Sequence, residues 1–330
     1  MKALVYTGPK TLVVRDEPDP QANDDVIVRV QVCGICGSDM HAYLGHDERR
    51  PPPQILGHEA IGIATSGAFE GRRVAINPLV TCGECDACRG GRQHVCRSRQ
   101  IMSMMPRAGA MAELVRAPES NLTPVPDGLP TEIAALTEPL AVGYHAVNLG
   151  ERALHLPLAG ARIAVIGGGA IGLCVAQVLE SRGARNVLIA ETSEIRRARL
   201  DKSGRFASFD PTGSRAPQAA SIDLVLDAYG GKASRAEASR LVAPGGVIVH
   251  IGLGSAEGGI DVRKLTLQEV KFIGSYCYTP VEFRETLAGL AAGIFGSFDW
   301  TEQRPLSEGA AAFAELDAGT VAAAKIMLRM

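Results

Sequence analysis

The chain has 330 residues, of which 46% are hydrophobic and 21% charged, and its formal net charge is −2. This length suffices for two domains with separate cores, and the near-neutral charge provides no attraction to nucleic acid or to an anionic membrane. No apolar run reaches about 18 residues, so no transmembrane helix is expected. Eight cysteines without a secretory segment favour a reducing compartment, which predicts a cytoplasmic protein without a nucleic-acid or membrane partner.

The first part of the chain, up to about residue 140, has the pattern of a β-rich domain. Short runs rich in β-branched residues at 26–32, 73–76 and 112–115 alternate with glycine and proline turns. Prolines become frequent where this region ends, which is typical of a chain leaving a sheet.

From about residue 160 the pattern changes to strands that alternate with helices. Apolar runs of strand length occupy residues 162–166, 186–190, 223–227, 246–251 and 270–273. The stretches between them have helical character, so this part is predicted to form a doubly wound parallel sheet of the α/β class. The remainder, roughly 275–330, is too small to stand alone and is expected to return to the first domain.

Four cysteines stand close together within the first region, at Cys82, Cys85, Cys88 and Cys96. Four thiolates at this spacing can surround one ion tetrahedrally, and Zn²⁺ is the usual ion of such a closed structural site. A redox pair or incidental thiols are the alternatives, but cysteines so close in sequence form disulfides only with strain. A zinc ribbon that binds nucleic acid is disfavoured by the charge of the chain.

A glycine motif, Gly167-x-Gly169-x-x-Gly172, follows the 162–166 strand and opens a helix. This context is the one that dinucleotide binding requires. The first glycine permits a tight turn, the second lets a pyrophosphate approach the backbone, and the third allows close packing of helix on strand. The helix start, with Ala170 and Ile171, then faces the phosphates. A plain glycine turn in an α/β domain is the alternative.

Glu191 ends the second strand of this domain, 24 residues after Gly167. A carboxylate there accepts hydrogen bonds from the hydroxyls of the adenosine ribose and repels a 2′-phosphate, which favours NAD over NADP. Arg196 and Arg197 keep NADP open as the alternative, because an arginine can accept that phosphate.

A second set of metal-binding side chains lies near the start of the chain. Cys36 follows a β-run, and His58 and Glu59 follow some twenty residues later. A cysteine, a histidine and a carboxylate from separate loops are suited to an open catalytic zinc site, whose free position takes water or substrate. Zinc lowers the pKa of an alcohol, and the alkoxide transfers hydride to a nicotinamide more readily.

Together these segments resemble the zinc-dependent medium-chain alcohol dehydrogenases over the whole length of the chain. The segments that carry the resemblance are 34–39, 57–59, the four-cysteine lobe, 138–140 and the glycine motif, in the order and spacing of that family. The resemblance implies a GroES-like catalytic domain, formed by residues 1–143 and 274–330, and a Rossmann NAD-binding domain at residues 144–273.

By resemblance, Cys36 and His58 are ligands of the catalytic zinc, and Glu59 binds it directly or transiently. Ser38 matches the hydroxyl that relays the alcohol proton, and His41 matches the outer histidine of that relay.

Glu138 stands where classical members of the family have a cysteine ligand, which resembles the polyol and threonine dehydrogenase branch. The segment 274–279 lacks the arginine with which sorbitol-type enzymes bind their substrate, so sorbitol specificity does not transfer simply.

The resemblance therefore implies an enzyme with two zinc ions per chain that transfers a hydride from a secondary alcohol, polyol or hydroxy amino acid to NAD. The alternatives are an NADP-dependent enzyme and a formaldehyde or primary-alcohol dehydrogenase. A zinc-free quinone reductase and a non-enzymatic structural protein are disfavoured, because both zinc sites are intact. The family also implies a homodimer or homotetramer.

Overall fold

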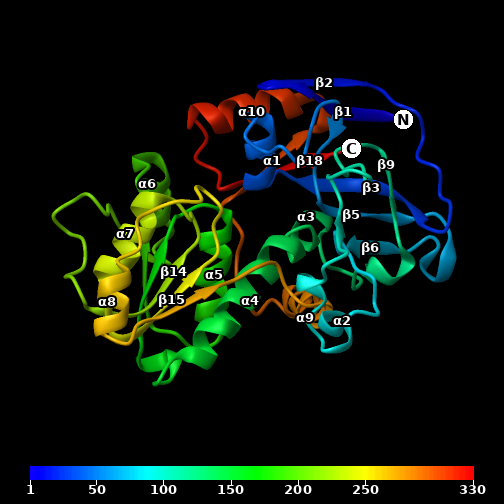
Figure 1. Cartoon of the computed structure of the whole chain (residues 1–330). Helices are drawn as coiled ribbons and strands as arrows, with labels where there is room; N and C mark the ends of the chain where they lie inside the picture. The colour runs from blue at the N-terminus through cyan, green and yellow to red at the C-terminus, as the bar shows by residue number, and fades with distance from the viewer. The chain divides into compact units, whose positions relative to one another are not determined.

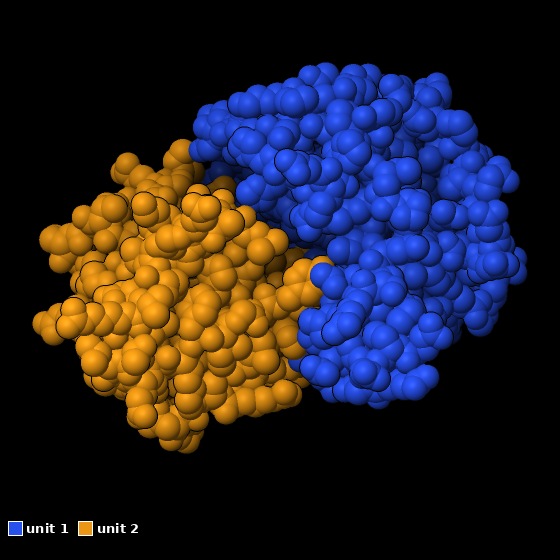
Figure 2. Space-filling model, viewed as in Figure 1, with its two compact units in different colours: residues 1–138, 279–293, 297–330 blue, residues 139–278, 294–296 orange.

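The computed structural model describes all residues, 1–330, and the chain divides into two compact units (Figure 2). Unit 1 contains both chain ends and comprises Met1–Glu138, Thr279–Gly293 and Ser297–Met330. Unit 2 comprises Pro139–Tyr278 and Ile294–Gly296. The second unit is thus an insertion into the first, as the cartoon colouring in Figure 1 also shows.

Unit 1 is built on a seven-stranded sheet in which β10, β6, β5, β3, β18 and β17 are neighbours in that order and β9 also pairs with β3. Its strands are β3 (Val26–Gly34), β5 (Glu59–Ala64), β6 (Arg73–Ile76), β9 (Leu114–Ala117), β10 (Leu122–Pro124), β17 (Thr301–Pro305) and β18 (Lys325–Arg329). Smaller sheets are formed by β1 (Lys2–Gly8), β2 (Thr11–Asp16) and β4 (Gln54–Ile55), and by β7 (Leu79–Val80) and β8 (Gln100–Ile101). The helices are α1 (Gly37–Tyr43), α2 (Asp86–Arg89), α3 (Thr131–Ala134), α9 (Pro280–Ala291) and α10 (Gly309–Ala318).

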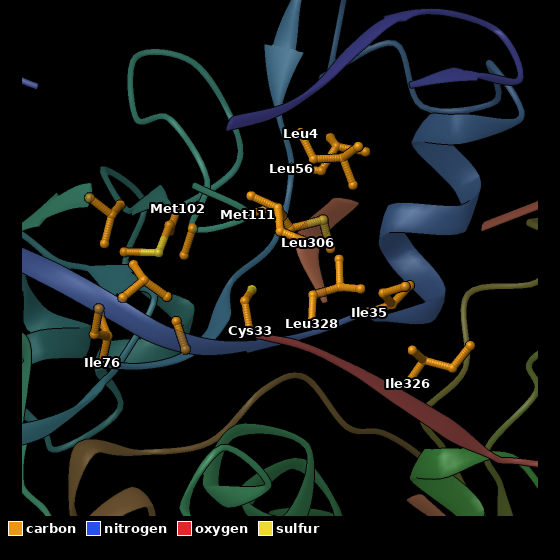
Figure 3. Packing of buried hydrophobic residues seen from close by; sticks show 14 of the residues in the cluster. Leu4, Cys33, Ile35, Leu56, Ile76, Met102, Met111, Leu306, Ile326 and Leu328 are labelled. Atoms are coloured by element: carbon orange, nitrogen blue, oxygen red, sulfur yellow. The ribbon is translucent and has the colours of Figure 1, made fainter. Parts of the chain in front are cut away.

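Strand β3 forms the centre of this unit because alternate residues along its first half are buried valines that face one core. The last strand of the chain, β18, lies antiparallel beside it, with Leu328 opposite Cys33. Figure 3 shows these two side chains close together, with Met111 and Leu306 nearby in the same apolar cluster. The core of unit 1 therefore joins residues from the start, middle and end of the sequence.

Unit 2 holds a six-stranded sheet whose strands are all parallel, in the order β13-β12-β11-β14-β15-β16. The strands are β11 (Arg162–Ile166), β12 (Asn186–Ala190), β13 (Ala207–Phe209), β14 (Ile222–Asp227), β15 (Val242–His250) and β16 (Lys271–Gly274). The helices are α4 (Thr137–Ala153), which begins in unit 1, and α5 (Ala170–Ser181), α6 (Glu194–Ser203), α7 (Lys232–Leu241) and α8 (Val262–Leu267). Figure 1 shows α5 and α7 on opposite sides of β14, which confirms the predicted doubly wound α/β architecture.

Because the strands are parallel and in register, their carboxyl ends lie side by side along one side of the sheet. Ile166, the last residue of β11, lies beside Ala190 on one neighbouring strand and Asp227 on the other. The residues that follow these strand ends, including the glycine motif, therefore gather where ligands bind in open α/β sheets.

None of the helices combines the length and the apolar character needed to cross a membrane.

Candidate functional site

The four cysteines of the lobe gather around one point, as their spacing predicts. The Sγ atoms of Cys82 and Cys88 are 3.9 Å apart, those of Cys85 and Cys88 3.6 Å, and those of Cys96 and Cys82 3.5 Å. Sulfurs that ligate one zinc at about 2.3 Å in a tetrahedron lie about 3.8 Å apart. The lobe thus has the dimensions of a closed zinc site, and none of its cysteines forms a disulfide.

Backbone groups favour the thiolate form, which a metal requires, at two of the four cysteines, whereas burial raises the pKa of Cys88 to about 11. The N–H of Cys88 holds the pKa of the Cys85 thiol at about 6, below its usual range. The N–H of Cys82 likewise lowers the pKa of Cys96. Cys85 also directly precedes the first residue of the short helix α2.

Cys36, His58 and Glu59 form the second group, and their potential ligand atoms all lie within 4.8 Å of one another. Sheet register explains the convergence, because Glu59 at the start of β5 pairs with Gly34 at the end of β3. Cys36 then caps the start of α1, two residues beyond that strand. A thiolate, an imidazole and a carboxylate on fixed strand and helix ends suit a zinc ion with an open position.

Asp39 organises the first two of these ligands. Its fully buried carboxylate accepts hydrogen bonds from the backbone N–H groups of Cys36, at 3.0 Å, and Gly57, at 3.2 Å. Its Oδ1 atom lies 3.7 Å from Nδ1 of His58. Burial acts to raise the pKa of Asp39, but the charges of His58 and Arg50 and the N–H of Cys36 together outweigh it and hold that pKa at about 2. Asp39 therefore stays ionised, and at 3.7 Å it attracts the imidazole of His58 by charge rather than through a hydrogen bond.

The pKa of His58 responds in the opposite direction. Burial acts to lower it, but the carboxylate of Asp39 and then the thiolate of Cys36 raise this pKa well above its usual value. Because a metal binds the neutral imidazole, zinc must displace a proton from His58, and zinc affinity falls as the pH falls.

Glu59 is bound by a residue that the sequence did not reveal. Nζ of Lys325, on β18, lies 2.6 Å from Oε1 and 2.8 Å from Oε2 of Glu59, and it also donates to the carbonyl of Ile35. Both side chains of the ion pair are buried almost completely. Gly34 makes room for this arrangement, because a Cβ atom there would lie 2.1 Å from Oε2 of Glu59. A lysine in an apolar C-terminal strand carries no sequence signal for a partner 266 residues away.

Ser38 and His41, the predicted relay pair, lie on α1, in its first and last turns. Both are partly buried. Burial, and then the neighbouring His46, hold the pKa of His41 below its usual range. Its imidazole is therefore neutral at pH 7 and can accept a proton. Sequence reasoning missed Arg50, whose guanidinium lies 3.3 Å from the Ser38 hydroxyl.

Glu138 is the second residue of α4 and is buried, but its carboxylate is not part of the Cys36, His58 and Glu59 group. Its role as a zinc ligand stays a prediction.

The glycine motif adopts the conformation that its spacing requires. Gly167, at φ +104°, makes the turn after β11, and Gly169 caps α5, whose first residues are Ala170 and Ile171. A Cβ atom on Gly172 would lie 1.7 Å from the carbonyl oxygen of Gly167, so only glycine fits there. The turn leaves amides at the start of a 12-residue helix, a site suited to a pyrophosphate.

Glu191 lies buried next to this turn. Its carboxylate accepts hydrogen bonds from the backbone N–H groups of Gly168, at 3.0 Å, and Ser193, at 2.8 Å. Nη1 of Arg196 lies 3.9 Å from Oε2 of Glu191, whereas Arg197 donates to the carbonyls of residues 191 and 192. The carboxylate is thus fixed to the glycine turn itself.

Comparison with known proteins agrees with this geometry. A family model described as an alcohol dehydrogenase GroES-like domain matches residues 22–127, and one described as a zinc-binding dehydrogenase matches residues 170–292. L-galactonate-5-dehydrogenase of Escherichia coli K12 is 30% identical over 307 residues, which cover 89% of this chain and 88% of that protein.

Two solved structures superpose over the whole chain. The alcohol dehydrogenase RspB of Escherichia coli CFT073, complexed with NADH, has a TM-score of 0.88 at 25% identity, and the superposition covers 99% of its chain. A protein of Sinorhizobium meliloti 1021 bound to NADP has a TM-score of 0.84 at 27% identity and is covered to 99%.

Replacing Lys325 with methionine leaves the buried Glu59 carboxylate without its cation. Removing one partner of a buried ion pair costs about 3–5 kcal/mol, so Lys325→Met should clearly lower the melting temperature of unit 1 in calorimetry. The double variant Lys325→Met/Glu59→Gln should recover much of the loss. If Lys325→Met had the same melting temperature as the wild type, the ion pair would not stabilise this unit.

Purified protein should contain two zinc ions per chain, one for each group of ligands. Cys82→Ser removes one of four thiolates and should retain about one zinc, with new protease cleavage between residues 82 and 96, because a structural zinc folds its own lobe. Elemental analysis and limited proteolysis measure both effects, and Cys277→Ser, outside either group, is the control. Full zinc content in Cys82→Ser would contradict the assignment.

Proposed function

The chain belongs to the zinc-dependent medium-chain alcohol dehydrogenase family, in its polyol dehydrogenase-like branch, and we propose that it oxidises a secondary alcohol, a polyol or a hydroxylated acid with NAD. The observation that carries the proposal is the convergence of Cys36, His58 and Glu59 in a chain that also holds the glycine turn for a dinucleotide. The curated relative that oxidises a sugar acid, L-galactonate, supports a substrate with several hydroxyl groups.

Cys36 and His58 would hold the catalytic zinc, together with a carboxylate. Glu138 is the better candidate for that third position, because both oxygens of Glu59 lie on Lys325 and Glu59 would have to leave its ion pair first. When bound, zinc supplies a Lewis acid that lowers the pKa of the substrate alcohol. Asp39 keeps a negative charge beside the imidazole of His58, and Ser38 and His41 carry the alcohol proton away.

The cofactor is proposed to be NAD because of the position of Glu191. Its carboxylate, held by the amides of Gly168 and Ser193, can accept the ribose hydroxyls and repels a 2′-phosphate. Arg196, near that carboxylate, is the residue on which NADP binding would depend.

A homodimer or homotetramer in the cytoplasm completes the proposal. The outer strand of the parallel sheet, β16, carries Phe272 with 40% of its surface exposed, which supports burial against another copy. A monomer by light scattering would contradict this part.

The proposed activity predicts NADH formation at 340 nm with at least one member of a panel of polyols, sugar acids, secondary alcohols and threonine. His58→Ala and Glu138→Ala should both yield folded protein that binds NAD but turns over at least about 100-fold more slowly, since each removes a ligand that positions the Lewis acid. Thermal melting with and without NAD controls for folding. Near-normal turnover in His58→Ala would refute the zinc mechanism. Near-normal turnover in Glu138→Ala would refute only the proposal that Glu138 is a zinc ligand.

Glu191 predicts a higher kcat/KM with NAD than with NADP. Glu191→Ala should narrow the ratio by about 10-fold or more, because it removes both a ribose hydrogen bond and a repulsive charge, each worth about 1 kcal/mol or more. Steady-state kinetics with both cofactors provide the ratio, and Glu194→Ala, on the exposed surface of α6, is the matched control. A wild type that prefers NADP would overturn the assignment and direct attention to Arg196.

A further inference from the structure

Arg50 lies in the loop between α1 and β4 and has only 2% of its surface exposed. Its guanidinium donates to the Ser103 carbonyl at 3.0 Å, to the Ser38 carbonyl at 2.8 Å and to the Ser38 hydroxyl at 3.3 Å. Its counter-ion is Asp47, whose Oδ2 atom lies 3.1 Å from Nη1. A buried guanidinium with partners in three segments has one fixed position, because its donors point along a rigid planar fork.

The contact with the Ser38 hydroxyl restricts what that hydroxyl can do. A serine hydroxyl has one O–H donor and two lone pairs that accept. The guanidinium occupies one lone pair and cannot itself accept a hydrogen bond. The O–H of Ser38 must therefore point away from Arg50, and a single lone pair is left to receive a proton.

We propose that Arg50 is a positioning residue that orients the Ser38 hydroxyl for proton transfer from the substrate alcohol. The inference rests on the proposed function, in which Ser38 relays that proton. The substrate O–H bond breaks as its proton binds the remaining lone pair of Ser38 Oγ. The original Ser38 proton leaves at the same time to the next acceptor, which is a water or the neutral imidazole of His41. Ser38 is neutral before and after the step.

The neighbouring Arg49 shows that a guanidinium in this loop need not serve Ser38. Its side chain is 61% exposed and its guanidinium pairs with Asp47. Arg50 alone of the two turns inward to Ser38, and it bonds both the carbonyl and the hydroxyl of that residue. The two arginines therefore offer a matched test within one loop.

The experiment is a double-mutant cycle on the zinc-loaded enzyme, with the best alcohol from the panel. Arg50→Lys keeps the charge but loses the fork, and should lower kcat by about 10- to 100-fold, the size of a general acid–base contribution. In the Ser38→Ala background the same change should cost less than about threefold, because the group that Arg50 positions is gone. Arg49→Lys should leave kcat unchanged.

Two results would overturn the proposal. An unchanged kcat in Arg50→Lys would show that the planar guanidinium is not needed. An equal loss of kcat with and without the Ser38 hydroxyl would show that Arg50 only stabilises the structure of the loop. Asp47→Asn, which releases the counter-ion but keeps Arg50, covers the case in which Arg50→Lys does not fold. It should show a smaller loss of kcat, again only when Ser38 is present, and an equal loss in the Ser38→Ala background would likewise overturn the proposal.

A crystal structure of Arg50→Lys separates this inference from the proposed function, because it needs no turnover. The Ser38 side chain should occupy more than one rotamer while Cys36 and His58 keep their places, and cobalt substituted for zinc should keep its absorption spectrum. A single unchanged Ser38 rotamer would refute the positioning role even in an active enzyme. A wild type inactive on the whole panel would instead refute the proposed function, while the rotamer result still decides the role of Arg50.

Discussion

The buried ion pair between Glu59 and Lys325 is the constraint on which unit 1 depends. It joins the start of β5 to the start of β18 across 266 residues, and the ammonium also binds the carbonyl of Ile35, next to Cys36. An isolated carboxylate or ammonium is very costly at such depth, so each is stable only in the presence of the other. The pair therefore holds β5, β18 and the segment after β3 together, and the proposed zinc ligands Cys36 and His58 lie next to these contacts.

The charges around Cys36 and His58 explain why this point suits a cation. Asp39 is ionised, with a pKa of about 2, and Glu59 and the sulfur of Cys36 lie close by. Lys325 balances the charge of Glu59, and the proton held by His58 balances that of Asp39, so a divalent ion at this point would take the place of that proton. In the glycine turn of unit 2 the helix start presents positive partial charge instead, suited to phosphate. The two units thus offer complementary electrostatics to a metal and to a dinucleotide.

Features set by local sequence could be predicted. The four cysteines lie within 15 residues, and the glycine motif needs only its own strand and helix, so spacing alone was enough to predict that each group would come together. The strands of the parallel sheet were found because their apolar runs are buried on both faces. The family resemblance supplied Ser38, His41 and Glu138, which no local pattern would have identified.

Features set by distant contacts could not be predicted. Lys325 and Arg50 each meet partners on other segments, and a single sequence does not show which buried cation meets which carboxylate or hydroxyl. The strand expected at 112–115 begins instead at Leu114, because Ala112 bridges to Ala3 and the N–H of Glu113 donates to the carbonyl of Lys2.

The separation of 266 residues between Glu59 and Lys325 also bears on how unit 1 folds. A contact between residues so far apart in the sequence forms only after a long loop has closed, and contacts of this kind slow folding. Until Lys325 reaches it, Glu59 is a carboxylate that the core cannot enclose at low cost. We therefore expect the central sheet of unit 1 to consolidate late, and a chain in which it has not formed to stay open to chaperones and proteases.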